Sequence, residues 1–143
     1  MDTAGDLVGR ELGPTRWLEV TQARIEAFAA ATDDPQWIHV DPVRAATGPF
    51  GTTVAHGFLT LSLLVPLLAE VLPAGDRVAV NYGVDRVRFP SPLPAGGRIR
   101  ARFRVESVES VPGGEHLRIA ATVERDGGEK PVCVAELVVR LLP

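Results

Sequence analysis

Two short blocks of this 143-residue chain carry residue types that move protons and stabilise negative charge. Asp34 and His39 flank a proline-containing segment, and Gly57 stands at the start of a long apolar run. A carboxylate and an imidazole together can serve as general base and general acid near neutral pH. A backbone N–H at a helix N-terminus has no intrahelical acceptor and can stabilise an oxyanion. These are the groups needed to add or remove water next to a carbonyl.

The spacing of Asp34 and His39 leaves their roles open. Five positions apart across a proline, they do not share a helix face, so they meet only if the loop folds back. Otherwise Asp34 caps the loop and His39 packs locally. A metal site is a further alternative, but none of the tight zinc spacings occurs, and we expect no metal. The candidate ligands for such a site are Asp33, Asp34, His39, Asp41 and His56.

Three more polar residues stand beside apolar ones. We expect His56 to be structural rather than catalytic, with substrate binding as a weaker alternative. Ser62 lies among leucines, where its hydroxyl needs a partner, either a carbonyl of its own helix or the Asp34 carboxylate. Asn81 either fixes His39 or lines the pocket.

Arginines form a row with alternate spacing, which places them on one face of a strand. The row comprises Arg98, Arg100, Arg102 and Arg104. A solvated outer face is the default interpretation. The functional alternative is a basic surface for nucleotide phosphates, to which Arg86 and Arg88 would add substrate-binding cations.

Helix signals surround the two blocks. Thr21 predicts an N-cap for a helix over 22–32, which Asp33 to Pro35 would end. A short second helix is expected over 41–46, with Asp41 as its cap. The run 57–71 is apolar nearly all round, which predicts a helix enclosed on all sides.

The remainder of the chain predicts strands. Residues 98–105 alternate between arginine and apolar residues, and 77–89, 115–125 and 131–142 are further strand candidates separated by short turns. Such strands form an antiparallel sheet. We therefore expect an α+β fold in which the sheet wraps around the apolar helix. One sheet layer cannot cover that helix completely, so we also expect at least a dimer.

Composition narrows the class of protein. The chain is 45% hydrophobic and 23% charged with a net charge of −3, which predicts one globular domain over 1–143 and argues against nucleic acid. The acidic start lacks secretory-signal features, and the apolar run is too short to span a bilayer. We expect a cytoplasmic protein without membrane contact. Cys133, the single cysteine, is expected to be a core residue.

Four motifs together resemble the MaoC-like dehydratases, or (R)-specific enoyl-CoA hydratases. They are DPQWIHVD at 34–41, VAHGF at 54–58, Ser62, and NYGVDRVRFP at 81–90. The resemblance spans about residues 25–103 and implies a dimeric hot-dog fold. It also implies a lyase of fatty acid metabolism that hydrates trans-2-enoyl thioesters to (R)-3-hydroxyacyl thioesters.

The resemblance also implies residue roles. Asp34 would take a proton from water, His39 would assist proton delivery at C2, Gly57 N–H would hold the thioester oxygen, and Ser62 would orient Asp34. No cofactor is implied beyond the coenzyme A or acyl carrier protein of the substrate, and the expected partner is a second copy of the chain. Two alternatives stay open: a hot-dog thioesterase and a non-catalytic subunit of a heteromeric dehydratase.

One position departs from the family pattern. Many members have glycine before the catalytic aspartate, whereas this chain has Asp33. Asp tolerates a left-handed backbone better than most residues, and we expect its side chain to face solvent.

Overall fold

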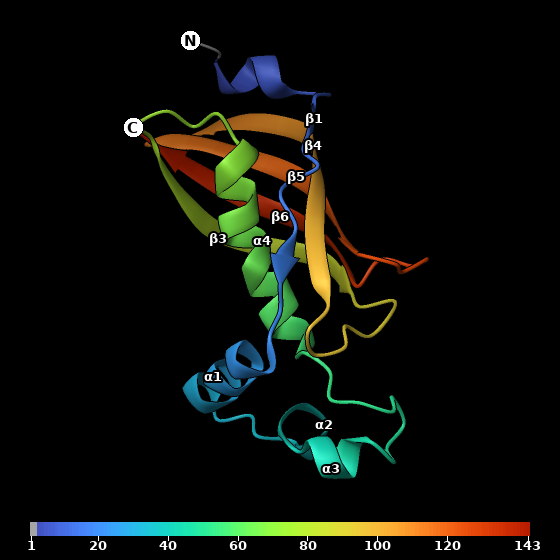
Figure 1. Ribbon diagram of the computed structural model, residues 1–143. Coiled ribbons are helices and arrows are strands. Elements are labelled where there is room, and N and C mark those ends of the chain that lie inside the picture. Colours follow the sequence, from blue (N-terminus) through green and yellow to red (C-terminus); the bar gives the residue numbers. More distant parts are fainter. Residues whose placement is uncertain (1–2) are drawn as a thin grey trace.

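A long helix lies against a single curved sheet in the computed structural model, which describes residues 3–143 (Figure 1). The helix is α4 (Gly57–Val71), and the sheet curves around one side of it. Within residues 3–143, no helix is long and apolar enough to cross a membrane.

Four long antiparallel strands build most of the sheet, as the alternating pattern predicts. They are β3 (Val78–Arg88), β4 (Arg98–Val111), β5 (Gly114–Arg125) and β6 (Cys133–Leu142). The strand order is β1-β4-β5-β6-β3, with β2 also paired to β4. Strand β3 therefore pairs with β6 and not with β4, its successor in the chain, because residues 89–97 cross to the other side of the sheet. As a result, β3 is an edge strand.

Three short elements precede the helices. They are a 3₁₀ helix over Ala4–Leu7, β1 (Glu11–Leu12) and β2 (Leu18–Glu19). No alternating pattern in the sequence singles out the 3₁₀ helix or β1. Two-residue strands carry too little alternation to be detected from sequence.

Strand β4 shows how the alternating pattern becomes a core. Its apolar residues are buried toward α4, whereas the arginines between them lie on the outer face. The inward residues are Ile99, Ala101, Phe103 and Val105. Cys133 at the start of β6 is also fully buried, and burial raises the pKa of its thiol to about 11. It is the core residue that the sequence predicts.

Helix α4 is covered on one side only, so the expected complete enclosure is wrong for a single chain. Leu64 and Leu67 are fully buried against the sheet, but the side chain of Phe58 is 67% exposed and Val65 is also exposed. A single sheet layer covers only one side of a helix that is apolar all round. The uncovered side leaves apolar surface for a further contact.

Three helices gather at the end of α4 where Gly57 lies: α1 (Gln22–Thr32), α2 (Trp37–Val40) and α3 (Pro42–Ala45) (Figure 1). The predicted caps of two are present. Thr21 Oγ1 accepts the backbone N–H of Arg24 at 3.1 Å, and Asp41 Oδ1 accepts that of Arg44 at 3.1 Å.

Asp33 ends α1 in the left-handed conformation at φ 55°, as its place in the motif predicts.

Candidate active site

Asp34 and His39 come together beside one pocket, although they belong to different elements. Asp34 follows the left-handed Asp33, and its N–H donates to Ala29 O at 3.0 Å, which closes the end of α1. His39 lies in the single-turn helix α2. The pocket has a volume of about 380 Å³, and both residues line it together with His56 and Gly57. The loop therefore folds back in the way that the acid–base hypothesis requires.

The distance between the two groups suits a bridging water. Ligand-type atoms of Asp34, His39 and His56 all lie within 4.8 Å of one another. A water molecule makes hydrogen bonds of about 2.8 Å at a tetrahedral angle, so it bridges acceptors about 4.5 Å apart. The Asp34 side chain is 52% exposed, whereas His39 is only 7% exposed. The pocket thus joins a solvated carboxylate to a buried imidazole.

Main-chain contacts fix the orientation of His39. Its Nδ1 lies 2.6 Å from Val54 O, and because a carbonyl only accepts, Nδ1 carries the hydrogen. The neutral ring then has a lone pair at Nε2. Burial, as the largest cause, lowers the pKa of His39 below its ordinary value, although the Val54 hydrogen bond acts in the opposite direction. The neutral form, an acceptor at Nε2, is therefore favoured near pH 7.

A side-chain relay that sequence reasoning missed holds the His39 segment in place. Gln22, the first residue of α1, donates Nε2–H to His39 O at 2.8 Å. Thr53 donates its hydroxyl to the side-chain oxygen of Gln22 at 2.6 Å. Val54 N–H in turn donates to Ile38 O at 3.0 Å. No motif spacing links Gln22 to Thr53, so only the tertiary structure reveals this contact.

His56 is in contact with both members of the pair. Its ring stacks on that of His39, with centroids 3.7 Å apart and planes inclined by 22°. Its Nε2 lies 2.9 Å from Asp34 O and 3.9 Å from Asp34 Oδ2. His56 is thus part of the site, in a structural position as expected rather than at the open face of the pocket.

Gly57 is the first residue of α4, as predicted, and it lines the pocket. Its N–H has no acceptor one turn earlier, and the helix dipole favours negative charge at this end. A Cβ at this position would lie 2.9 Å from the ring of Phe89, closer than real Cβ contacts. Glycine therefore lets Phe89 pack over the start of the helix.

Aromatic side chains that the sequence did not single out form the apolar part of the pocket. They are Phe28, Phe58 and Phe89. Phe58 and Phe89 pack with ring centroids 6.3 Å apart. Phe89 reaches this place after an irregularity in β3, where the pairing register shifts between Asp85 and Arg88 and Arg86 adopts φ 51°.

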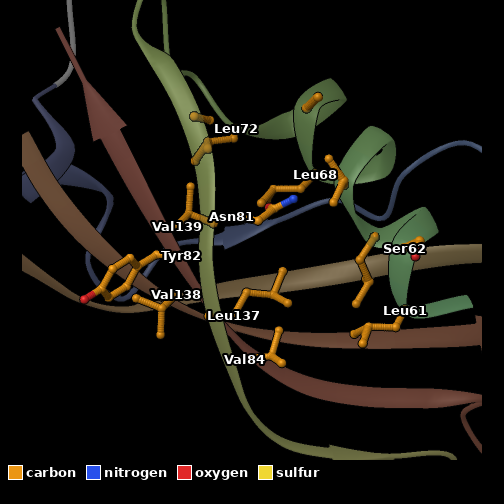
Figure 2. A pocket seen from close by; sticks show the side chains of 15 residues that line it. Leu61, Ser62, Leu68, Leu72, Asn81, Tyr82, Val84, Leu137, Val138 and Val139 are labelled. Carbon is orange, nitrogen blue, oxygen red and sulfur yellow. The ribbon is translucent and has the colours of Figure 1, made fainter. Parts of the chain in front are cut away.

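Ser62 and Asn81 line a different cavity, of about 460 Å³, between α4 and strands β3 and β6 (Figure 2). Ser62 Oγ donates to Phe58 O at 2.8 Å, so the hydroxyl bonds to a carbonyl of its own helix. Five residues along a helix turn the side chain about 140° from Gly57, away from the pocket that Asp34 and His39 line. Of the two partners expected for Ser62, the structure therefore shows the carbonyl of its own helix and not the Asp34 carboxylate that the resemblance implies. Asn81 lines this second cavity and not the pocket that contains His39.

The arginine row of β4 is an ion-paired outer face. Arg98 pairs with Asp126 at 2.5 Å, and Arg100 and Arg102 share Glu124. Arg104 lies 3.8 Å from Glu11 and from Glu106. These partners neutralise the row, so the structure favours the default interpretation over a phosphate-binding surface. Arg86 and Arg88 are exposed on β3, close in sequence to Phe89 of the pocket.

The geometry of the two imidazoles disfavours a metal ion at this site. Asp34, His39 and His56 are close enough to act as ligands. However, His39 Nδ1 and His56 Nε2 contact carbonyl oxygens, so an ion could use only the other nitrogen of each ring. For His56 the other nitrogen is Nδ1, which is buried and so is not open to an ion in the pocket. An acid–base pair fits the arrangement better.

Comparison with known proteins finds relatives among dehydratases. The family model described as "MaoC like domain" matches residues 3–126. The 3-hydroxyacyl-thioester dehydratase Z of Mycobacterium tuberculosis is 48% identical over 134 residues, which cover 92% of this chain and 89% of that protein.

Solved structures show the same fold. The (R)-hydratase from A. caviae involved in PHA biosynthesis superposes with a TM-score of 0.79 at 28% identity and covers 95% of this chain and 96% of its own. R-hydratase PhaJ1 from Pseudomonas aeruginosa superposes with a TM-score of 0.77 at 27% identity, covering 94% and 81%. The α+β architecture is therefore the hot-dog fold of MaoC-like hydratases.

Proposed function

This chain belongs to the MaoC-like dehydratase family, and we propose that it catalyses reversible hydration of a trans-2-enoyl thioester to the (R)-3-hydroxyacyl thioester. The observation that carries the proposal is the placement of the Asp34 carboxylate and a His39 ring nitrogen within 4.8 Å beside a pocket that also contains Gly57. A hydro-lyase needs these groups and no redox centre.

Water is oriented by two acceptors in this proposal. The Asp34 carboxylate accepts one hydrogen of the water, and the Nε2 lone pair of His39 accepts the other. The oxygen lone pair then points at C3 of the enoyl group. Positioning of this kind removes much of the entropic cost of bringing water to the substrate.

Proton transfer follows from the same geometry. As the oxygen bonds to C3, Asp34 takes a proton from the water, and this proton returns to C2 on the same face, which gives syn addition. In the neutral ring His39 has no hydrogen at Nε2, so it holds the water rather than delivering a proton itself. This refines the expected role of His39, because its lowered pKa favours the neutral ring.

Gly57 N–H is the proposed oxyanion donor. Attack at C3 shifts charge to the thioester oxygen, and a fixed N–H at the positive end of α4 stabilises that charge more strongly than it stabilises the ground state. The aromatic ring of Phe89 against Gly57 shields this contact from water.

The substrate is proposed to be a thioester of coenzyme A or acyl carrier protein, with no metal and no separate cofactor. Both carriers present phosphate groups, which guanidinium groups bind well. Arg86 and Arg88, exposed just before Phe89, are the proposed cations for them.

A homodimer is the proposed assembly. Strand β3 is an edge of the sheet, and every position but one along it is exposed. The strand also presents exposed apolar side chains, namely Val78, Val80, Tyr82 and Val84. Antiparallel pairing with β3 of a second copy would satisfy the open backbone edge and cover these side chains.

Isotope labelling separates hydration from thioester hydrolysis. With crotonyl-CoA in H₂¹⁸O, we expect the label at C3 of a 3-hydroxybutyryl thioester whose configuration is R on chiral chromatography. Label in a carboxylate together with free thiol would instead establish the thioesterase. Absence of both products, repeated with a longer enoyl chain, would favour the non-catalytic subunit.

A further inference from the structure

His56 lies at the junction between the two proposed catalytic groups, and the mechanism above gives it no part. The residue occupies the N-cap position of α4 and is 3% exposed. Phe28 packs against its ring with centroids 4.9 Å apart, and His39 stacks at 3.7 Å. The ring is therefore held by aromatic neighbours from α1 and α2.

Hydrogen bonding determines the tautomer of His56. Nε2 lies 2.9 Å from Asp34 O, and because this carbonyl only accepts, Nε2 carries the hydrogen. Nδ1 is buried and has no hydrogen-bond partner within the described residues.

Neither nitrogen of His56 is free to react. Nε2 is occupied by the main chain of Asp34, and Nδ1 does not reach solvent. His56 therefore cannot exchange protons with substrate in this arrangement. Its contacts are instead with the atoms that place the catalytic groups: the Asp34 backbone and the flat face of His39.

The segment around Asp34 needs a contact that fixes its position relative to His39. Asp34 follows a left-handed residue and precedes Pro35, so no helix or strand fixes it relative to α2. We propose that His56 is a positioning residue, which sets the separation of Asp34 and His39 by donating Nε2–H to Asp34 O while stacking on His39. This inference rests on the proposed function.

Two substitutions separate the two contacts. His56→Phe keeps an aromatic ring against His39 but removes the Nε2–H donor, whereas His56→Gln keeps an amide donor but loses the stack. For His56→Phe we expect kcat to fall about tenfold to a hundredfold, with KM within about twofold, because misplaced reacting groups slow the chemical step rather than binding. We expect His56→Gln to recover part of this loss.

His116→Phe is the matched control. His116 on β5 is also packed against an aromatic ring, Tyr82, with centroids 4.3 Å apart, and also has a buried unpartnered nitrogen, Nε2. It lies outside the catalytic pocket. His116 is only partly buried, and its substitution should leave kcat unchanged. Equal losses of kcat in the two histidine-to-phenylalanine variants would overturn the positioning role.

NMR supplies a readout that does not depend on activity. The titratable groups facing His56 are Asp34 and His39, and the proximity of His56 is one cause of the lowered pKa of His39. In His56→Phe the pKa of His39 should therefore rise. In the wild-type chain, the ¹⁵N shifts of His56 should show hydrogen at Nε2. Hydrogen at Nδ1, or an unchanged His39 titration in a folded variant, would contradict the inference.

The same experiments distinguish this inference from the proposed function. If wild-type protein does not hydrate enoyl thioesters, the proposed function fails. The His56 tautomer and the His39 titration still test whether His56 holds Asp34 and His39 together. If wild type is active and His56→Phe retains kcat and the His39 titration, only the positioning role fails.

Discussion

His39 and Val54 are joined by a hydrogen bond of 2.6 Å from Nδ1 to the carbonyl oxygen. This bond places the ring hydrogen on Nδ1, so neutral His39 has an acceptor lone pair at Nε2. Because burial lowers the pKa of His39 below 6.5, the acceptor form is present near pH 7. His39 should therefore hold the water rather than act as an acid.

Hydration activity should consequently show an acid limb. We expect kcat/KM to be level above pH 6.5 and to fall as the pH decreases through the lowered pKa of His39, because the protonated ring no longer accepts from water. A pH–rate profile measures this. Activity that declines as the pH rises through the same range would show that His39 acts as the acid.

The same shift also affects stability. The unfolded chain binds a proton at His39 more readily than the folded chain does. The contribution of neutral His39 to the free energy of unfolding should therefore be complete above pH 6.5 and decrease as the pH falls below it.

Gly57→Ala should separate activity from stability. The new Cβ would lie 2.9 Å from the Phe89 ring and force it aside, which opens the oxyanion position to water. We expect kcat/KM to fall about tenfold or more, because oxyanion donors contribute about a hundredfold to a thousandfold. Thermal unfolding should change little, since alanine favours a helix over glycine.

Gly5→Ala is the control for this variant. A Cβ at Gly5 would make only an ordinary contact of 3.7 Å with Thr3 Oγ1. Unaltered turnover in Gly57→Ala, with a crystal structure showing Phe89 displaced, would remove Gly57 from the mechanism.

Ser62→Ala should leave kcat within about twofold of wild type. The hydroxyl donates to Phe58 O on its own helix and lines the other cavity, so its removal affects no proposed catalytic atom. Steady-state kinetics with a short enoyl thioester tests this. A loss comparable to that of an Asp34 variant would restore the orienting role that the motif implied.

Charge on the edge strand should prevent the proposed dimer. Val80 and Val84 are exposed on β3, and a two-fold axis through paired β3 strands would bring their replacements close together. We expect Val80→Glu/Val84→Glu to sediment as a monomer. Val43→Glu, on the exposed helix α3, should sediment like wild type. A wild-type chain that sediments as a monomer would refute the homodimer.

Local rules predict the longer elements of this fold because the relevant signals are local, but they miss the short ones, such as the single-turn helix α2. Thr21 caps α1 and Asp33 takes the left-handed conformation, as side-chain chemistry predicts. Alternation locates the four long strands, although β4 continues six residues past its predicted end at 105, to Val111. The pairing of β3 with β6 depends on a crossover of residues 89–97, which no local pattern encodes.

Some features of the site are likewise predicted from the sequence, and others depend on tertiary structure. Motif spacing identified Asp34, His39 and Gly57, and the structure brings them to one pocket. The family resemblance implies an orienting role for Ser62, but its hydroxyl bonds to its own helix. The stacking of His56 on His39 is a tertiary contact between α2 and the N-cap of α4, which no local pattern predicts.

The most direct test follows the enoyl absorbance of crotonyl-CoA with wild-type protein and Asp34→Asn in parallel, with free thiol assayed in both. The account predicts that wild type removes the enoyl absorbance without releasing thiol, and that Asp34→Asn, folded as judged by circular dichroism, is slower by about a hundredfold or more. Near-wild-type turnover in Asp34→Asn, or thiol release by the wild type, would contradict it.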